Sequence, residues 1–221
     1  MDTFINVLSV TATISTIGLF LCGIPICQRI RQRGTTDGTS IAPFFLTCVG
    51  CFCMFGYGYL RKDMTVKFVN GVGFSFQVVY LFYYYMHTRV KRKVNKFIAA
   101  VIVIMCATVW YVNSERSLEE KQNVLGTICM VLNIATIGSP LADIGQVIST
   151  KSTESLPFAL CVANMVVSVQ WLLYGFLIND FYIKMPNIVA VMISAVQLSL
   201  FIIYPAPTYA NLVNKNDNEI L

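Results

Sequence analysis

The stretch that decides the fold is Trp171–Asn187, which reads W-L-L-Y-G-F-L-I-N-D-F-Y-I-K-M-P-N. It joins the end of one strongly apolar segment to the start of another through a short polar turn. A related sequence, M-F-G-Y-G-Y-L-R-K-D-M-T-V-K-F-V-N, occurs at Met54–Asn70. In both copies Asp follows a Tyr-Gly pair by five residues and Asn follows that Asp by seven. This conserved spacing within the chain indicates an internal duplication, which in a membrane protein points to transport.

Composition excludes an ordinary soluble domain. Of the 221 residues, 56% are hydrophobic and only 12% are charged, whereas soluble domains are about a quarter charged. The apolar runs are about 20 residues long, which is the length that crosses a bilayer. The net charge of +5 follows the loops between these runs, so we expect a lipid bilayer and no nucleic acid as partner.

The cysteines lie inside the apolar runs or at their edges, where they act as small apolar residues. Cys48, Cys51 and Cys53 are close enough to suggest a metal site. Zinc would need a closed shell of four ligands, and no fourth ligand is near. We therefore expect no metal and no cofactor.

Seven spans are expected from the lengths of the apolar runs. The fourth is the shortest and lies outside the duplication, so it reads as a linker that lets two three-span units keep the same orientation. The predicted fold is an all-α integral membrane protein with two parallel three-helix bundles joined by a linker helix. The spans are placed at 4–27, 41–60, 64–86, 97–112, 124–148, 157–178 and 181–204.

The same pattern gives the expected domains and orientation. The first triple-helix repeat covers 1–90, the linker with the fourth helix 91–119, the second repeat 120–206 and a polar tail 207–221. Lysines and arginines are more numerous in the loops after spans one, three and five and in the tail than on the opposite side. The positive-inside rule then predicts an N-terminus outside and a C-terminus in the cytosol.

Four residues from the two repeats are expected at one depth, about 10 Å below the outer surface of the hydrocarbon. They are Met54, Asn70, Trp171 and Asn187. An amide that faces lipid is left unpaired at a cost of several kcal/mol, so both asparagines should face inward. Two amides suit a solute with hydroxyl groups, and a Trp face suits a sugar ring while its N–H can still bond. The alternative is that the asparagines only hold helices together.

Four prolines lie toward the opposite side: Pro25, Pro43, Pro140 and Pro157. Pro43 and Pro157 fit ordinary helix starts. Pro25 and Pro140 lie in or near the end of a span, where the missing N–H predicts a kink. Corresponding breaks in both halves are typical of hinges that open and close one face.

Charged and polar residues lie just above the predicted pocket. Tyr57, Lys62 and Asp180 could bond across it and close the outer face, whereas Asp63 is expected to be a solvated loop charge. Asp143 is the only acidic residue within an apolar span, and it lies toward the cytosolic end. Its depth argues against ion coupling and favours facilitated diffusion. The single histidine, His87, has no catalytic partner pattern, so an enzyme is not expected.

With these residues in place, the chain resembles the eukaryotic SWEET sugar transporters of the MtN3/saliva type, animal ones in particular, from span one to span seven. The motifs that carry the resemblance are P-I-C-Q-R-I-R at 25–31, S-I-A-P-F at 40–44, V-N-G-V-G at 69–73, S-P-L-A-D at 139–143, T-K-S-T-E-S-L-P-F at 150–158, W-L-L-Y-G at 171–175 and D-F-Y-I-K-M-P-N at 180–187.

The resemblance implies a bidirectional uniporter for mono- or disaccharides, glucose-like by preference, that works by alternating access. By the same resemblance, Asn70 and Asn187 bind the sugar, Trp171 stacks on it and Met54 completes the pocket. It also implies an inner gate formed by the four prolines and an outer gate of Tyr57, Lys62 and Asp180. The expected location is the plasma membrane, with the Golgi as a second one.

Two departures make the pocket asymmetric: Met54 matches Trp171, and Val69 matches Pro186. The choice between glucose and sucrose stays open. Small residues such as Gly71 and Gly73 would permit a homo-oligomer.

Three alternatives remain. A proton-coupled carrier of amino acids or another small solute, of the PQ-loop type, would use Asp143, but the sequence has no Pro-Gln dipeptide. A seven-span receptor would not show the three-plus-one-plus-three repeat. A non-transporting partner protein would keep the fold as a scaffold, which the intact asparagine pair and proline set argue against.

Overall fold

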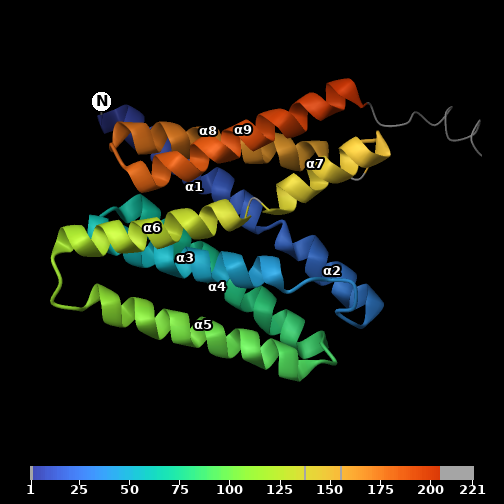
Figure 1. The fold of residues 1–221 in the computed structure, drawn as a ribbon, viewed down its shortest axis with the longest axis horizontal. Coiled ribbons are helices and arrows are strands. Elements are labelled where there is room, and N and C mark those ends of the chain that lie inside the picture. Colours follow the sequence, from blue (N-terminus) through green and yellow to red (C-terminus); the bar gives the residue numbers. More distant parts are fainter. Residues whose placement is uncertain (1, 137, 155, 205–221) are drawn as a thin grey trace, which may run out of the picture.

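The computed structural model of the protein describes residues 2–136, 138–154 and 156–204. These residues form helices and short connections (Figure 1). In chain order the helices are α1 (Asp2–Phe20), α2 (Gly23–Arg33), α3 (Ala42–Arg61), α4 (Met64–His87), α5 (Lys91–Val112), α6 (Leu118–Thr136), α7 (Gly138–Thr150), α8 (Phe158–Leu177) and α9 (Phe181–Ile203).

The helices make seven membrane spans, because α1 with α2 and α6 with α7 each belong to one span. Six of these spans are long and apolar enough to cross a bilayer by length and composition. The seventh is α4, which carries Lys67, Asn70 and Gln77 along with several tyrosines. It packs against α1, α2 and α3, so the neighbouring helices of its own bundle cover much of its polar surface.

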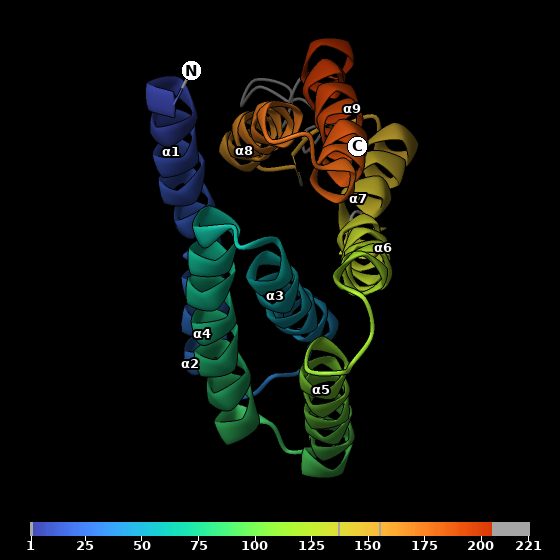
Figure 2. The same ribbon diagram turned by 90° about the vertical axis from the view of Figure 1, so that its left-hand side faces the viewer.

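The spans form two three-helix bundles with a linker helix, as the sequence predicts. In the first bundle α4 contacts α1 and α3, and in the second α9 contacts α6 and α8. The bundles meet through two corresponding contacts, α3 with α6 and α1 with α8. The linker α5 packs on α3 at the outer edge of the first bundle (Figures 1 and 2).

The first span is interrupted just before a Gly-x-Pro sequence, and the same sequence recurs in the fifth span. In the first, α2 begins at Gly23, and Pro25 cannot donate a hydrogen bond to the carbonyl of Leu21. The N–H of Ile24 bonds to that carbonyl instead, at 2.9 Å. In the second, α7 begins at Gly138 and Pro140 is its third residue. The break expected at Pro25 is therefore present, whereas the one expected at Pro140 concerns residue 137, which lies outside the described residues.

The α3–α4 and α8–α9 turns repeat each other in detail. Lys62 and Asn179 both adopt the left-handed conformation, with φ of 56° and 51°. The N–H of the following residue bonds to the carbonyl of Gly58 in the first turn and of Gly175 in the second, at 2.9 Å in both. We call the end of the molecule with these turns the turn end and the opposite end the proline end.

Some expected boundaries differ from the structure. The fourth span was expected at 97–112 and as the shortest, but α5 begins at Lys91 and has 22 residues, more than α3 or α8. The segment 91–96, which holds four basic residues, is helical because a helix can extend past the hydrocarbon into the interface, with its long cationic side chains in water. The predicted tail, 207–221, lies outside the described residues.

The close approach of α3 to α4 gives a test of the packing. A Cβ atom at Gly58 would lie 2.9 Å from the backbone nitrogen of Lys67, which cannot move aside alone. We expect Gly58→Ala to lower the free energy of unfolding by about 1–3 kcal/mol, measured as the thermal unfolding midpoint of purified protein in detergent.

The matched control is Gly50→Ala in the same helix, where a Cβ would meet nothing within 4 Å. Both variants gain the same intrinsic helix propensity. An equal change of the midpoint in the two variants would contradict the packing.

Candidate functional site

A cavity of about 290 Å³ lies between the two bundles, on the proline-end side of the turns. All four residues predicted at one depth line it: Met54 from α3, Asn70 from α4, Trp171 from α8 and Asn187 from α9. Each of the four is half-buried. The structure thus brings to one hollow the two asparagines that are related by the repeat.

The two asparagines are held in the same way. The Nδ2 of Asn70 donates to the carbonyl of Val66 at 2.8 Å, and the Nδ2 of Asn187 donates to the carbonyl of Ile183 at 2.7 Å. Each amide keeps its side-chain oxygen and a second N–H for a ligand. The cavity therefore offers two acceptors and two donors in fixed positions, which suits a solute that carries several hydroxyl groups.

Trp171 differs from the expectation that its N–H is free to bond a solute. The indole Nε1 donates to the Oγ1 of Thr16 in α1 at 2.8 Å, and Thr16 in turn donates to the carbonyl of Ala12. The ring also packs edge-on against Tyr174. The bond to Thr16 ties the indole to the first bundle, so what the ring presents to the cavity is apolar surface for stacking.

Further polar groups in the cavity were missed from the sequence. Thr16, Thr47, Asn133 and Thr136 also line it. The sequence did contain a signal for Asn133. Its amide lies in the apolar run of α6, and exposing that amide to lipid costs as much free energy as exposing Asn70 or Asn187. The three threonines had none, since a hydroxyl can bond back to its own helix, as Thr16 and Thr136 do.

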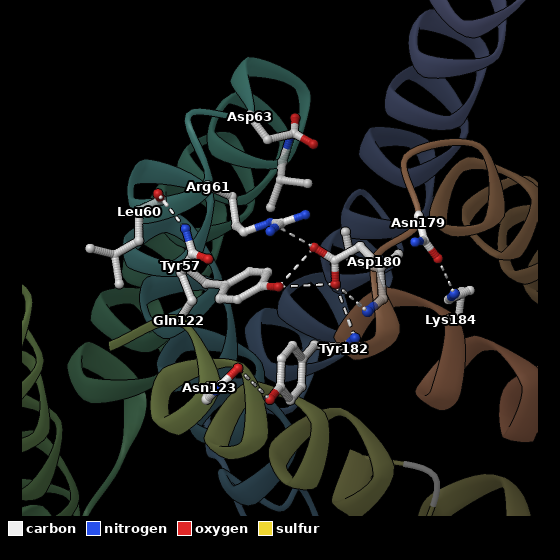
Figure 3. A network of polar contacts seen from close by, with 12 residues as sticks. Tyr57, Leu60, Arg61, Asp63, Gln122, Asn123, Asn179, Asp180, Tyr182 and Lys184 are labelled. Atoms are coloured by element: carbon white, nitrogen blue, oxygen red, sulfur yellow. Dashed lines mark hydrogen bonds and ion pairs between the residues drawn. The ribbon is translucent and has the colours of Figure 1, made fainter. Parts of the chain in front are cut away.

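At the turn end, the buried carboxylate of Asp180 joins the two bundles (Figure 3). The hydroxyl of Tyr57 donates to both of its oxygens, at 2.9 and 2.7 Å. The Nε of Arg61 pairs with Oδ2 at 3.1 Å. The same carboxylate caps α9 by accepting from the N–H groups of Tyr182 and Ile183. A negative charge at a helix N-terminus is favourable, so the contacts support each other.

The repeat produces a second, reciprocal contact. Tyr174, the counterpart of Tyr57, donates to the Oδ2 of Asp63 at 2.9 Å. Asp63, the counterpart of Asp180, also caps α4 by accepting from the N–H of Val66. The expectation that Asp63 is a solvated loop charge is therefore wrong. It was made because a charge in a short loop is usually solvated, and position alone does not reveal a partner 111 residues away.

The cation at this site is Arg61, whereas Lys62 was expected. Lys62 ends α3 in the left-handed conformation, and its side chain is exposed and forms no ion pair among the described residues. Arg61 lies in the last turn of α3, on the side of Asp180 (Figure 3). The counterpart of Arg61 in the second repeat is Ile178, so the contact between Tyr174 and Asp63 has no cation from this position.

Other contacts close the turn end between α6 and its neighbours. The Nε2 of Gln122 donates to the carbonyl of Leu60 at 2.9 Å, and the hydroxyl of Tyr182 donates to the Oδ1 of Asn123 at 3.1 Å. Tyr182 also packs edge-on against Tyr57. Below this layer lies an apolar cluster of Leu8, Val66, Tyr174 and Ile183, drawn from both bundles. The turn end is thus bonded and packed across the two bundles.

The four prolines lie at the other end or within the first and fifth spans. Pro25 follows the break in the first span and Pro140 is in the first turn of α7. Pro43 is in the first turn of α3 and Pro157 is the N-cap of α8. At this end α2 and α7 lie apart in both views (Figures 1 and 2). The cavity therefore has a bonded, packed end and an end where the helices separate.

Comparison with known proteins gives the relatives of this chain. A family model described as sugar efflux transporter for intercellular exchange matches residues 6–92 and 123–209. The chain is 35% identical to sugar transporter SWEET1 of Caenorhabditis elegans, over 93% of this chain and 67% of that protein. It is 35% identical to sugar transporter SWEET1 of Drosophila pseudoobscura pseudoobscura, over 93% and 92%.

A mammalian relative and a solved structure agree with this. Sugar transporter SWEET1 of Mus musculus is 32% identical over 90% of each chain. The 3.7 Å structure of a eukaryotic SWEET transporter superposes with a TM-score of 0.85 at 26% identity, covering 92% of this chain and 97% of that one. The predicted fold and the resemblance stated from the sequence are confirmed.

The two aspartates give a test of the turn end. Asn at either position keeps an oxygen for the helix cap but loses the charge. We expect Asp180→Asn to lower the free energy of unfolding by about 1–3 kcal/mol, and more than Asp63→Asn does, because only Asp180 is both buried and paired with a cation. Thermal unfolding of the two purified variants measures this, and equal losses would show that the Arg61 pair contributes nothing.

Proposed function

The chain belongs to the SWEET (MtN3/saliva) family of sugar transporters, and we propose that it is a bidirectional uniporter that carries a sugar across the membrane by alternating access. The observation that carries the proposal is the cavity between the bundles. Asn70 of the first bundle and Asn187 of the second line it from matching positions of the two repeats. A carrier needs a site that either bundle can expose, and a site built from both repeats meets this need.

In this proposal the sugar binds between the two amides. Asn70 and Asn187 exchange hydrogen bonds with its hydroxyl groups, and Trp171 and Met54 supply apolar surface for the C–H face of the ring. Asn133 and Thr136 from α6 add polar partners on one side. A cavity of about 290 Å³ favours a glucose-like monosaccharide in this part of the site.

The outer gate in this proposal is the pair of reciprocal contacts at the turn end. Tyr57 with Asp180 and Tyr174 with Asp63 each join one bundle to the other, and Arg61 strengthens the first. Opening would break both pairs, at about 1.5–3 kcal/mol for each hydrogen bond to a charged group. The inner gate is the proline set, because Pro25 and Pro140 each remove a backbone hydrogen bond and so let α2 and α7 move without disturbing α1 and α6.

Facilitated diffusion, without a proton, follows from the composition of the cavity. The described lining contains amides, hydroxyls and apolar groups and does not include Asp143, which is half-buried on α7. Proton coupling normally uses an ionisable group close to the substrate.

The orientation in this proposal puts the turn end outside the cell, which follows from the distribution of lysine and arginine. The plasma membrane is the proposed location, with the Golgi as a second one. The two repeats at 1–90 and 120–206, joined by 91–119, are the proposed moving units, and the matched segments 6–92 and 123–209 support this division.

Uptake of radiolabelled glucose into vesicles containing the purified protein tests the function. We expect wild-type uptake with or without a proton gradient and a loss of at least about tenfold in Asn187→Ala, because an amide that bonds the sugar in every step is removed. The matched control is Asn113→Ala, an exposed amide at the end of α5. Uptake that requires the gradient would point to a coupled carrier using Asp143, and no uptake by folded wild type would refute the sugar uniporter.

The gate has its own test in the double variant Tyr57→Phe, Tyr174→Phe. Both phenyl rings keep the packing but lose the hydroxyls that bond to the carboxylates. We expect the rate of uptake to fall several-fold, because the state with a closed turn end is less populated, while glucose affinity in detergent changes less. Unchanged transport rates would show that these two tyrosine–aspartate pairs do not form the gate.

A further inference from the structure

A hollow of about 560 Å³ lies on the outside of the first bundle, at the turn end. It is formed by the α3–α4 turn, the C-terminal end of α5 and the first residues of α6, and it shares no lining residue with the cavity between the bundles. Helices α4 and α5 lie on either side of α3 here (Figure 2). Three lysines line this basic hollow: Lys62, Lys67 and Lys121.

The positive charge of the basic hollow is not neutralised by the protein. No acidic residue lines it, and neither of the ion pairs in the described part of the chain involves its lysines. Of the carboxylates directly next to a lysine in the sequence, Asp63 accepts from Tyr174. Glu120 pairs with Arg116. Like charges that share one space repel each other, so a bound anion would stabilise this arrangement.

The lysines keep hydrogen-bond donors for such an anion. Lys121 donates to the carbonyls of Val112 and Ser114, which leaves one of its three N–H groups. Lys62 is exposed, and Lys67 is half-buried one turn into α4. A lysine at this depth in a membrane protein normally has a charged or polar partner, so Lys67 in particular indicates a negatively charged ligand.

Two apolar grooves lead away from the basic hollow along the first bundle. The groove between α3 and α4 has a volume of about 330 Å³ and shares Met64 and Lys67 with the hollow. The groove between α3 and α5 has a volume of about 440 Å³ and shares Tyr59 and Val112 with it. Phe55 lines both grooves. One basic space is thus continuous with two apolar ones.

The grooves have the depth of one leaflet of a bilayer. The first extends along α4 from Met64 to Ser75, about 16 Å of helix. The second extends along α3 from Tyr59 back to Phe52, about 10 Å. Half of the hydrocarbon core is about 15 Å deep. Exposed aromatic residues such as Tyr59 and Trp110, in the last turns of α3 and α5, are typical of the headgroup level.

We propose that the basic hollow and its two grooves bind one anionic phospholipid of the surrounding bilayer. The phosphate lies among Lys62, Lys67 and Lys121, and each groove holds one acyl chain. A soluble phosphate would leave the grooves unused, and a zwitterionic lipid would bring a further cation to the lysines. The site does not rest on the proposed transport of sugar, because it needs only the membrane fold of the first bundle and its linker helix.

Lipid binding to the purified full-length protein in detergent tests the site, with native mass spectrometry measuring the dissociation constant of the first bound lipid. The probe is dioleoyl phosphatidylglycerol. Dioleoyl phosphatidylcholine has the same chains without the net charge, oleoyl lysophosphatidylglycerol has the same headgroup with one chain, and inorganic phosphate has no chain. We expect wild type to bind the probe at least about fivefold more tightly than any of the other three.

The double variant Lys62→Met, Lys67→Met removes two charges and keeps the apolar stems of the side chains. A lysine beside an anionic lipid contributes about fivefold in affinity. We therefore expect a loss of roughly tenfold to thirtyfold for dioleoyl phosphatidylglycerol, and a change within about twofold for dioleoyl phosphatidylcholine. Lys121 is left in place because it bonds to the end of α5.

The second repeat supplies the matched control, Lys184→Met. Lys184 is the counterpart of Lys67, and it lies over the ring of Phe176 as Lys67 lies over that of Tyr59. It bonds to Asn179 and does not line the basic hollow. The control removes a charge at the same level of the membrane, so the affinity for each lipid should stay within about twofold of wild type.

The grooves are tested by Gly71→Leu, which keeps all the lysines. A Cβ at Gly71 would meet only the ring of Phe55, at an ordinary contact distance of 3.5 Å, and the rest of the leucine side chain would fill the groove between α3 and α4. We expect the affinity for the diacyl probe to fall severalfold, whereas the lysolipid, whose single chain can use the other groove, should bind within about twofold of wild type.

Three outcomes would overturn the lipid site. Equal affinity of wild type for the two diacyl lipids refutes it without any variant. A loss in Lys184→Met as large as in the double lysine variant would show an effect of net charge alone. Equal affinity for the probe, the lysolipid and phosphate would show a simple anion site in which the grooves take no part. Unfolding midpoints measured without lipid show that each variant is folded.

Discussion

The buried carboxylate of Asp180 is the group on which the turn end depends. It accepts hydrogen bonds from Tyr57 in the other bundle, pairs with Arg61 and caps the helix that carries Asn187. A charge this deep is tolerated only when its partners are fixed. The position of Asn187 in the cavity and the closure of the turn end are therefore set by the same side chain, which links the proposed binding site directly to the proposed gate.

The duplication gives this arrangement twice, but with unequal strength. Asp63 repeats the cap and accepts from Tyr174, yet Ile178 stands where the first repeat has Arg61. The second contact is also more exposed than the first. The cavity is unequal in the same way, because the first repeat has Met54 where the second has Trp171. The two halves thus share a backbone arrangement, while the side chains at matching positions differ in size, charge and hydrogen bonding.

The sequence predicted the helices, their grouping and the four residues at one depth, because repeat spacing and helix rise fix the level of a residue in the membrane. It could not fix which way a residue points once a helix ends. Lys62, predicted at the outer gate, lies in the left-handed turn that follows α3, and Arg61, one residue earlier in the helix, is the cation that pairs with Asp180. The contact of Asp63 and the bond from Trp171 to Thr16 were missed because both depend on how the bundles meet, which no local pattern records.

The ring of Tyr80 beside Gly23 has a mechanical consequence. The ring packs against the break between α1 and α2, and its hydroxyl donates to the carbonyl of Phe20. A break packed in this way resists bending, because any change of the angle between the helices opens a void or forces a clash. In the second repeat the position of Tyr80 is taken by Gln197, which borders an open hollow beside α7. The first half is therefore the stiffer one, and in the proposed alternating access the second half absorbs most of the deformation.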